Sequence, residues 1–526
     1  MKRLVVATAL ILAFFPLGAQ TAANLGSVRR VPDYEVFEKM DAYIDQVRED
    51  WNIQGMAVLI GDGEEMLYCR YHGWRDEEAS ERHPVDGNTL FQLASVSKSF
   101  TATLVAMLVD EGLISWDDKV ADILPDFEMP DKWTSEHATV RDFTCHRSGL
   151  DRESGSKLAR LGYDKEDLMH VMRFMKPAYE FRDGYRYNDL AYVIPALIVE
   201  KVTGKSWKDN IIERIYEPLG MDHAMFRGEE YAGAFADGTA SWPHDFRDDN
   251  GRMAVRRHTP EEISAGVPAA SEAAGGIITT PMEMMRWAQF HLNGGVTADG
   301  RRILSQEQMD ILHAGVNVVS QSLDHITLYA QGWNVEQSRK CHIIWHTGTN
   351  TGQIALCAFI PELDRVVTIN ADTKIGAEPR FAILRRYIDL CLGLEDYDYN
   401  AEALKAWHEA HPVREAVRTA AAADAPETGD ILGNYIKNDI FGEIRIGQRE
   451  GRLLLTMVKP GRTFELRHSD GNFFEFMSSG TTFRVEFLFE GPKSKASGIR
   501  FVSGVPEEFG PWMRDLARDP HAQPAK

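Results

Sequence analysis

Cysteine is scarce in this chain, with only five among 526 residues. A disulfide scaffold is therefore excluded as the basis of the fold. Cys341 and Cys357 flank an expected hairpin and could face each other, so one disulfide between them stays open. The chain also lacks a cluster of His and Cys at metal-ligand spacing and a glycine-rich phosphate loop. We therefore expect neither a metal site nor a cofactor.

Positive charge and long apolar runs are scarce as well. The 58 Lys and Arg residues are outnumbered by 79 Asp and Glu residues, and the net charge of −21 argues against nucleic acid as a partner. The apolar run from Leu4 to Leu17 is too short to cross a bilayer of about 30 Å comfortably. It follows Lys2 and Arg3 and precedes small residues, a pattern that predicts a signal peptide over residues 1–23. We expect an exported protein, periplasmic or secreted, with no transmembrane segment in the mature chain.

The remaining composition is that of a globular protein, 44% hydrophobic and 26% charged. Helical and strand patterns mix in a first domain over residues 30–396. Strand patterns lie near its start, at 55–60, and near its end, at 343–345 and 353–360. Strands at both ends with helices between them predict an α+β domain with an antiparallel sheet covered by helices.

A change of composition marks the end of that domain. Residues 397–428 include a stretch of small and polar residues broken by Pro426, which predicts a linker. Residues 429–515 alternate apolar and polar side chains, with turn signals at spacings near ten residues. This pattern predicts a small antiparallel all-β domain, a barrel or a sandwich.

The most informative motif is Ser95-Val-Ser-Lys98, which precedes apolar residues at helical spacing. Residues three apart share a helix face, so the Lys98 amine can reach the Ser95 oxygen and activate it as a nucleophile. The tetrapeptide alone favours a helix-capping serine beside a solvated lysine, and only the motifs further along the chain reverse this interpretation. A second copy, Ser154-Gly-Ser-Lys157, has no apolar helix pattern following it directly, and we interpret it as a loop.

Two further motifs follow in order, Tyr185-Arg-Tyr187-Asn-Asp189 and His346-Thr347-Gly348-Thr349. With them, residues 35–393 resemble the serine hydrolases of the class C β-lactamase and penicillin-binding-protein superfamily. The part after the linker resembles the small lipocalin-like β domains appended to many of these hydrolases. Four other stretches support the resemblance: Gly55-Met-Ala-Val, His146-Arg-Ser-Gly-Leu, Glu217-Pro-Leu-Gly-Met and Ala274-Gly-Gly-Ile-Ile-Thr-Thr.

The resemblance implies a β-lactamase/transpeptidase-like fold with an all-helical subdomain, and it implies a role for each matching residue. Ser95 would form an acyl-enzyme, and Lys98 would activate it or hold the proton network together. Tyr187 would pass a proton to the leaving group and later activate water. The backbone N–H groups of Ser95 and Thr349 would form the oxyanion hole. The substrate-binding residues would be Asp189, His346, Thr347 and Gly348.

Asp189 departs from the family pattern, in which asparagine is usual. If it points toward Lys98, its charge favours a protonated lysine, shifts the base role toward Tyr187, and disfavours an anionic substrate. The alternative is that Asp189 only caps the helix that begins there. Both alternatives remain open from the sequence.

His346 is a second departure, because β-lactamases usually carry lysine there. The His-Thr-Gly-Thr sequence is similar to soluble D-alanyl-D-alanine carboxypeptidases, and other His-x-Gly members are D-aminopeptidases and esterases. A histidine with a pKa of about 6.5 is mostly neutral at pH 7 and attracts a substrate carboxylate less firmly than lysine. His346 could instead be a strand histidine bonded to backbone. His146 matches a packing motif, and we assign it no chemistry.

We therefore expect an exported serine acyl hydrolase acting on D-amino-acid-containing peptides, as a D-Ala carboxypeptidase or a D-aminopeptidase. One alternative is an esterase of small acyl esters, with or without weak β-lactamase activity. Another is an inactive penicillin-binding or sensor scaffold. The expected partner is a small-molecule or peptide substrate, and the oligomeric state stays open.

Overall fold

An eight-stranded antiparallel sheet forms the centre of the first domain. The computed structural model describes residues 31–152, 155–249, 252–259, 262–263, 269–375, 378–394, 397–412, 424–438, 441–478, 481–491, 494–503 and 515–518. The strand order is β2-β1-β13-β12-β11-β10-β9-β8. The strands are β1 (Gly55–Gly61), β2 (Met66–Gly73), β8 (Asn317–Gln321), β9 (His325–Tyr329), β10 (Asn334–Ser338), β11 (His342–Asn350), β12 (Gln353–Ile360) and β13 (Arg365–Ala371).

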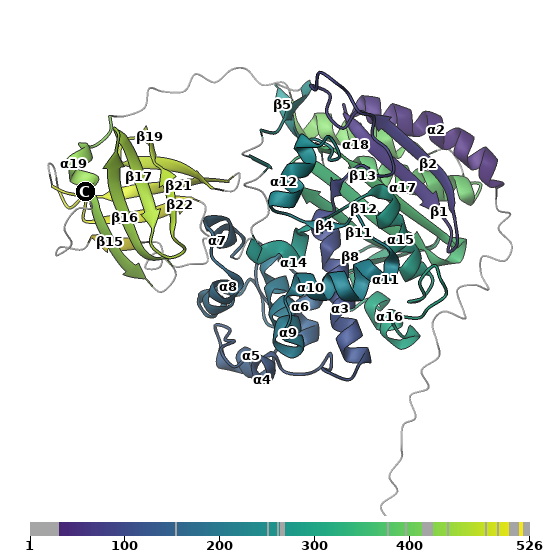
Figure 1. The fold of residues 1–526 in the computed structure, drawn as a ribbon, viewed down its shortest axis with the longest axis horizontal. Coiled ribbons are helices and arrows are strands. Elements are labelled where there is room, and N and C mark those ends of the chain that lie inside the picture. Colours follow the sequence, from purple (N-terminus) through teal and green to yellow (C-terminus); the bar gives the residue numbers. More distant parts are fainter. Residues whose placement is uncertain are drawn as a thin grey trace, which may run out of the picture.

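Helices cover both faces of this sheet (Figure 1). Helices α2 (Asp33–Asp50) and α17 (Glu378–Cys391) pack on one face, and α15 (Pro281–Leu292) packs on the other. Every residue of β1 is buried, and alternate side chains enter different cores, with Val58 beside α2 and Leu59 on the opposite side. A strand covered on both faces has a continuous apolar sequence rather than an alternating one. The predicted α+β fold is confirmed.

Helix α3 (Ser97–Asp110) begins inside the Ser-x-x-Lys motif, includes Lys98 and runs through the interior. Every residue from Ser97 to Leu108 is buried, because α9, α10, α14 and α16 all contact it. The helix is therefore buried all round, where its apolar spacing alone predicts one buried stripe. It ends before Gly112, whose φ of +70° suits the left-handed position that follows many helices.

The helical side of the domain is built from short segments, several of which pack against α3. These are α4 (Val120–Ile123), α5 (Lys132–His137), α6 (Val140–Thr144), α7 (Ser156–Leu161), α8 (Lys165–Val171), α9 (Val193–Thr203), α10 (Trp207–Ile211), α11 (Glu217–Leu219), α12 (Glu229–Ala236), α14 (Glu272–Gly275) and α16 (Gln306–His313). Lys157 lies in α7, so the loop predicted there is wrong for this residue, and Ser154 lies outside the described residues.

Two small sheets complete the domain. One has the order β3-β7-β4 and the other β14-β5-β6. Their strands are β3 (Phe91–Gln92), β7 (Ile277–Thr279), β4 (Met225–Phe226), β14 (Thr373–Lys374), β5 (His244–Asp249) and β6 (Arg252–Arg257). Because β3 immediately precedes the motif serine, its pairing with β7 anchors the start of that segment to the domain.

The predicted linker begins with a helix, α18 (Tyr399–Ala410), which packs against α17. The Asn400 side chain accepts a hydrogen bond from the buried Trp51 indole at 2.7 Å, and its own N–H₂ donates to Asp50. The first part of the 397–428 range therefore belongs to the packing of the first domain. The composition that predicts a linker comes from later residues, and 413–423 lie outside the described part.

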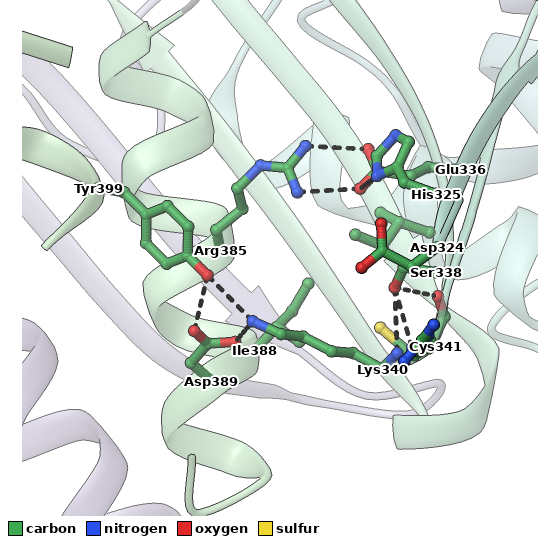
Figure 2. Close-up of a pocket in the computed structure, with 12 residues that line it drawn as sticks. Asp324, His325, Glu336, Ser338, Lys340, Cys341, Arg385, Ile388, Asp389 and Tyr399 are labelled. Atoms are coloured by element: carbon green, nitrogen blue, oxygen red, sulfur yellow. Dashed lines mark hydrogen bonds and ion pairs between the residues drawn. The ribbon is translucent and has the colours of Figure 1, made fainter. Parts of the chain in front are cut away.

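A polar cluster joins α17 and α18 to strand β10 around a cavity of about 200 Å³ (Figure 2). Arg385 of α17 binds the buried Glu336 through two N–H groups, at 3.0 and 3.2 Å. Lys340 binds Asp389 at 2.6 Å. The carboxylates of Glu336 and Asp389 are thus each paired with a basic side chain, and these two ion pairs connect the sheet to α17.

All five cysteines are free thiols, so the disulfide considered for Cys341 and Cys357 does not form. Cys357 pairs in register with His346, whereas Cys341 precedes strand β11 and packs in a different core. None of the helices in the described part of the chain is both long and apolar enough to cross a membrane. Residues 1–23, predicted as a signal peptide, lie outside the described residues.

The C-terminal part is a nearly closed antiparallel barrel of nine strands, which confirms the predicted small β domain (Figure 1). Phe483, Val485 and Phe487 point into its core, as their alternation predicts. The barrel contacts the first domain where the Ser478 hydroxyl donates to the Arg160 carbonyl of α7 at 2.6 Å. After α19 (Thr428–Ile431) come β15 (Gly433–Asn438), β16 (Gly442–Arg449), β17 (Arg452–Met457), β18 (Arg462–Glu465), β19 (Arg467–Asp470), β20 (Phe473–Ser478), β21 (Thr481–Leu488), β22 (Gly498–Ser503) and β23 (Asp515–Arg518).

Candidate active site

Ser95 lies in a single 3₁₀ turn, η1 (Ala94–Val96), directly before α3. Ala94 adopts a φ of +48°, a left-handed conformation that costs about 1 kcal/mol or more for a residue with a side chain. Strand β11 comes so close that a Cβ on Gly348 would lie 1.9 Å from the Leu93 carbonyl oxygen. Glycine at 348 therefore permits the approach that brings the third motif beside Ser95.

The Lys98 ammonium is completely buried and has three acceptors. Its Nζ lies 3.2 Å from Ser95 Oγ, 2.6 Å from Asp189 Oδ1 and 2.9 Å from the Ala274 carbonyl oxygen. Three acceptors match the three protons of an ammonium group. Burial lowers the pKa of Lys98, and Asp189 opposes that shift without cancelling it.

Tyr187 lies against the same ammonium, with its ring centroid 4.7 Å from Lys98 Nζ. Its hydroxyl is buried and has no hydrogen-bond partner among the described residues. Burial raises the pKa of Tyr187 well above 10, the Asp189 charge adds to the increase, and the nearby Ser95 hydroxyl opposes it. Tyr187 is therefore a neutral phenol at pH 7, and its unpaired hydroxyl is a buried polar group that a substrate atom could satisfy.

Asp189 takes the first of its two possible arrangements and points to Lys98. It stands at the N-cap of η3 (Leu190–Tyr192), but its side chain makes no capping hydrogen bond. The carboxylate is 46% exposed, whereas its lysine partner is fully buried. The pair is therefore open to solvent from the aspartate side only.

His346 is buried and neutral. Its Nδ1 lies 2.7 Å from the Thr347 carbonyl oxygen, which can only accept, so this nitrogen carries the proton. The Tyr329 hydroxyl then donates to Nε2, at 3.0 Å. Burial and the nearby Lys98 charge lower the pKa of His346 to about 3. Both ring nitrogens of His346 therefore form hydrogen bonds within the protein. The bond to the Thr347 backbone agrees with the alternative considered from the sequence, a strand histidine bonded to backbone.

The rest of the third motif lies along β11, with Thr347 half-buried and Thr349 exposed. The buried Arg380 of α17 supports this stretch from behind. It donates to the Gly348 carbonyl and to the Ala355 carbonyl on the neighbouring strand, the latter at 2.9 Å. Arg380 was missed from the sequence because a helix arginine carries no motif that reveals a backbone partner.

His146 and its neighbours hold the segment that carries Tyr187. The His146 ring centroid lies 4.4 Å from that of Tyr187. Its carbonyl accepts from the Arg186 N–H at 3.1 Å, and its Nδ1 accepts from the Asn188 N–H at 3.3 Å. Two hydrogen bonds thus flank the tyrosine on either side, which fits the packing role expected of His146.

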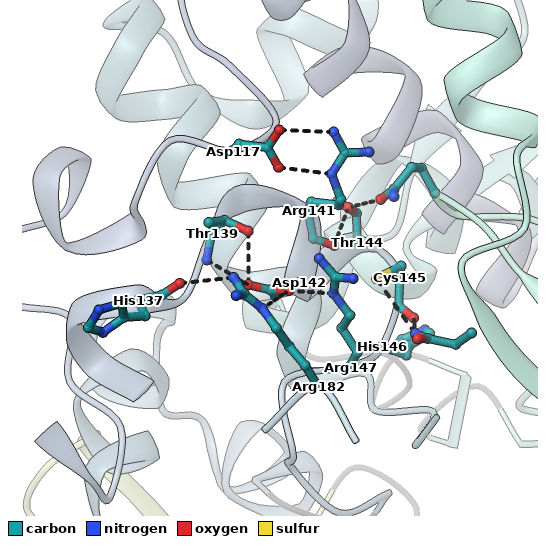
Figure 3. Close-up of polar contacts among 12 residues, drawn as sticks. Asp117, His137, Thr139, Arg141, Asp142, Thr144, Cys145, His146, Arg147 and Arg182 are labelled. Carbon is teal, nitrogen blue, oxygen red and sulfur yellow. Dashed lines mark hydrogen bonds and ion pairs between the residues drawn. The ribbon is translucent and has the colours of Figure 1, made fainter. Parts of the chain in front are cut away.

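The buried carboxylate of Asp142, in α6, connects this helix to the segments that carry His146 and Arg182 (Figure 3). Asp142 accepts from Thr139 in the capping box of α6, from Arg147 next to His146, and from Arg182. Arg182 has a φ of +66°, a strained conformation that two hydrogen bonds to Asp142 help to maintain. Hydrogen bonds to the arginines and to Thr139 lower the pKa of Asp142 despite its burial.

The fold and this constellation define a serine hydrolase. The "Beta-lactamase" family model matches residues 40–390, and the chain belongs to that family. The predicted resemblance is therefore confirmed.

Among curated relatives, the chain is 25% identical to the unguisins hydrolase ungD of Aspergillus violaceofuscus, over 89% of this chain and 88% of the relative. It is 29% identical to penicillin-binding protein 4 of Amycolatopsis lactamdurans, over 55% and 72%.

Solved structures share the fold. The octameric penicillin-binding protein homologue of Pyrococcus abyssi superposes with a TM-score of 0.57 at 19% identity, covering 89% of this chain and 98% of that one. A class C β-lactamase gives 0.54 at 20% identity, over 69% and 97%. A D-stereospecific amidohydrolase from Streptomyces gives 0.52 at 18% identity, over 66% and 98%.

Proposed function

We propose that this serine hydrolase cleaves amide bonds of D-amino-acid-containing peptides through an acyl-enzyme on Ser95. The observation that supports the proposal most directly is the contact of Ser95 with a fully buried lysine, 3.2 Å from its oxygen. A serine hydroxyl needs such a neighbour to lose its proton during attack.

The two neighbouring groups suit different steps. Burial lowers the pKa of Lys98, which increases the fraction able to accept the serine proton. Tyr187 has a pKa raised well above 10 and keeps its proton, so it is suited to donate to the leaving group. This division differs from the sequence-based expectation that Asp189 shifts the base role to Tyr187, because burial outweighs the aspartate charge at Lys98.

Acylation also requires hydrogen-bond donors for the oxyanion and residues that bind the peptide. The backbone N–H groups of Ser95 and Thr349 are proposed for the oxyanion, since Gly348 lets β11 approach the serine turn closely. Asp189, Thr347 and Gly348 are proposed to line the substrate. His346 contributes to shape rather than charge, because it is neutral and bonded to Tyr329.

The names of the relatives support an amide substrate. One curated relative is named a hydrolase of unguisins, and a structural neighbour is named a D-stereospecific amidohydrolase. Export is part of the proposal and depends on the signal-like sequence of residues 1–23.

Labelling with a fluorescent fluorophosphonate and with a fluorescent penicillin tests the nucleophile. We expect stoichiometric labelling of the wild type, none in Ser95→Ala, and a loss of turnover of at least about 10³-fold in that variant. Ser97→Ala is the matched control, because this serine is buried nearby but bonds to the Ile277 N–H. No adduct with either reagent in the wild type would favour the inactive scaffold.

A substrate panel tests the bond that is cleaved. It contains an Nα-acyl-D-Ala-D-Ala peptide, D-amino-acid amides and p-nitrophenyl esters. We expect cleavage of the D-peptide with the highest kcat/KM relative to its L-isomers. Ester cleavage without any D-peptide cleavage would contradict the proposal and favour the esterase alternative.

A further inference from the structure

An arginine at the rim of the site has no assigned role. The exposed Arg152 places its guanidinium carbon 6.0 Å from the Tyr187 ring centroid. It forms no ion pair with any residue that the structure describes. Its charge also reaches Lys98, since it contributes to the lowering of the pKa of that lysine.

The other charges of the site compensate one another. Lys98 and Asp189 form an ion pair at 2.6 Å, and His346 is neutral. Among Lys98, Asp189, His346 and Arg152, only Arg152 therefore carries a charge without an opposite partner in the group. An unpaired guanidinium presents a planar set of donors that matches a carboxylate.

The position of Arg152 relative to Tyr187 indicates which end of the substrate it meets. Under the proposed function, on which this inference rests, Tyr187 donates to the nitrogen of the leaving group. A cation beside Tyr187 then lies on the leaving-group side. In an amino acid that leaves from the C-terminus of a peptide, the nitrogen and the carboxylate are separated by a single carbon atom.

We infer that Arg152 binds the free carboxylate of a C-terminal amino acid, which makes the enzyme a carboxypeptidase rather than an aminopeptidase. Ser95 Oγ forms a bond to the acyl carbon, the C–N bond breaks, and the serine proton passes in net through Lys98 and Tyr187 to the leaving nitrogen. The free amino acid leaves, and water then hydrolyses the ester on Ser95. Repulsion of the carboxylate by Asp189 is reduced while Lys98 is protonated, because the two then form an ion pair at 2.6 Å.

A pair of substrates tests this assignment in the full-length enzyme. They are Nα-acyl-D-Ala-D-Ala and its C-terminal amide, which differ only in the charge. We expect Arg152→Gln to lower kcat/KM for the acid about 10- to 100-fold, with little change for the amide. Arg152→Lys should recover part of the loss. Arg186→Gln is the matched control, because this arginine lies next to Tyr187 but faces Asp151 at 3.8 Å.

Equal losses on both substrates, or no loss on the acid, overturn the inference. A second measurement separates it from the proposed function. D-alanine should protect Ser95 from fluorophosphonate labelling better than D-alaninamide does, and this preference should vanish in Arg152→Gln. If neither peptide is cleaved but the preference is present, the proposed function fails and the carboxylate site stands. If the preference is absent in the wild type, the carboxylate site fails.

Discussion

Two aspartates near the site bind basic side chains, and the difference between them is which partner is buried. Asp142 is fully buried and its arginines Arg147 and Arg182 are partly exposed. At the other pair, Lys98 is fully buried and Asp189 is 46% exposed. A buried acid surrounded by donors stays ionised, whereas a buried base is pushed toward its neutral form.

The two ion pairs accordingly have different consequences for the buried member of each pair. Asp142 accepts hydrogen bonds on both oxygens and fastens the segments beside Tyr187, and its pKa is lowered. Lys98 also has a lowered pKa, but for a base this means a greater readiness to lose its proton. The same type of ion pair therefore supports the fold at Asp142, whereas at Lys98 it accompanies a base with a lowered pKa, the group proposed to react.

Removing the buried acid should have the largest effect on stability. Asp142→Asn leaves two arginines without their counter-charge, and we expect a loss of about 3–5 kcal/mol in the free energy of unfolding. Because the pKa of Asp142 in the fold is below its usual value of 3.8, its contribution is present at neutral pH and is lost as the pH falls below about 4. Chemical denaturation at several pH values measures both.

Asp117→Asn is the matched control for this variant. Asp117 pairs with Arg141 beside the same cluster but is 73% exposed (Figure 3). An exposed pair contributes less than about 1 kcal/mol. Equal losses in the two variants would show that burial does not distinguish these aspartates.

Removing the exposed acid should change the pH dependence instead. The Asp189 charge raises the pKa of Lys98 against the effect of burial. In Asp189→Asn the pKa of Lys98 should fall further, so the acidic limb of the kcat/KM profile should move to lower pH by about one unit. The profile is measured with a neutral ester so that substrate charge does not contribute. A shift to higher pH, or none, would contradict the assignment of Lys98 as the base.

The sequence predicted the members of the candidate site better than their surroundings. Ser95, Lys98, Tyr187 and Asp189 stand in motifs whose order identifies them, and the structure brings them together. The sequence pattern did not reveal that the backbone carbonyl of Ala274 accepts a hydrogen bond from Lys98.

The degree of burial was equally invisible in the sequence. Lys98 and His346 look like ordinary titrating residues in a motif, but tertiary packing removes both from water. Desolvation depends on elements distant in the chain, which a local motif does not contain. For this reason the sequence-based interpretation included the effect of the Asp189 charge on the pKa of Lys98. It did not include the larger, opposite effect of burial.

The smallest effect on activity is expected at His346, the residue that marks the third motif. Its pKa of about 3 keeps it neutral throughout the working range, and it acts as an acceptor for Tyr329. In His346→Gln, whose side-chain carbonyl can also accept, we expect a loss in kcat/KM of less than about 10-fold and the same pH profile between pH 5 and 8. If the variant lost an ionisation near pH 6.5 that the wild type shows, His346 would be charged during turnover. It would then compete with Arg152 for the substrate carboxylate.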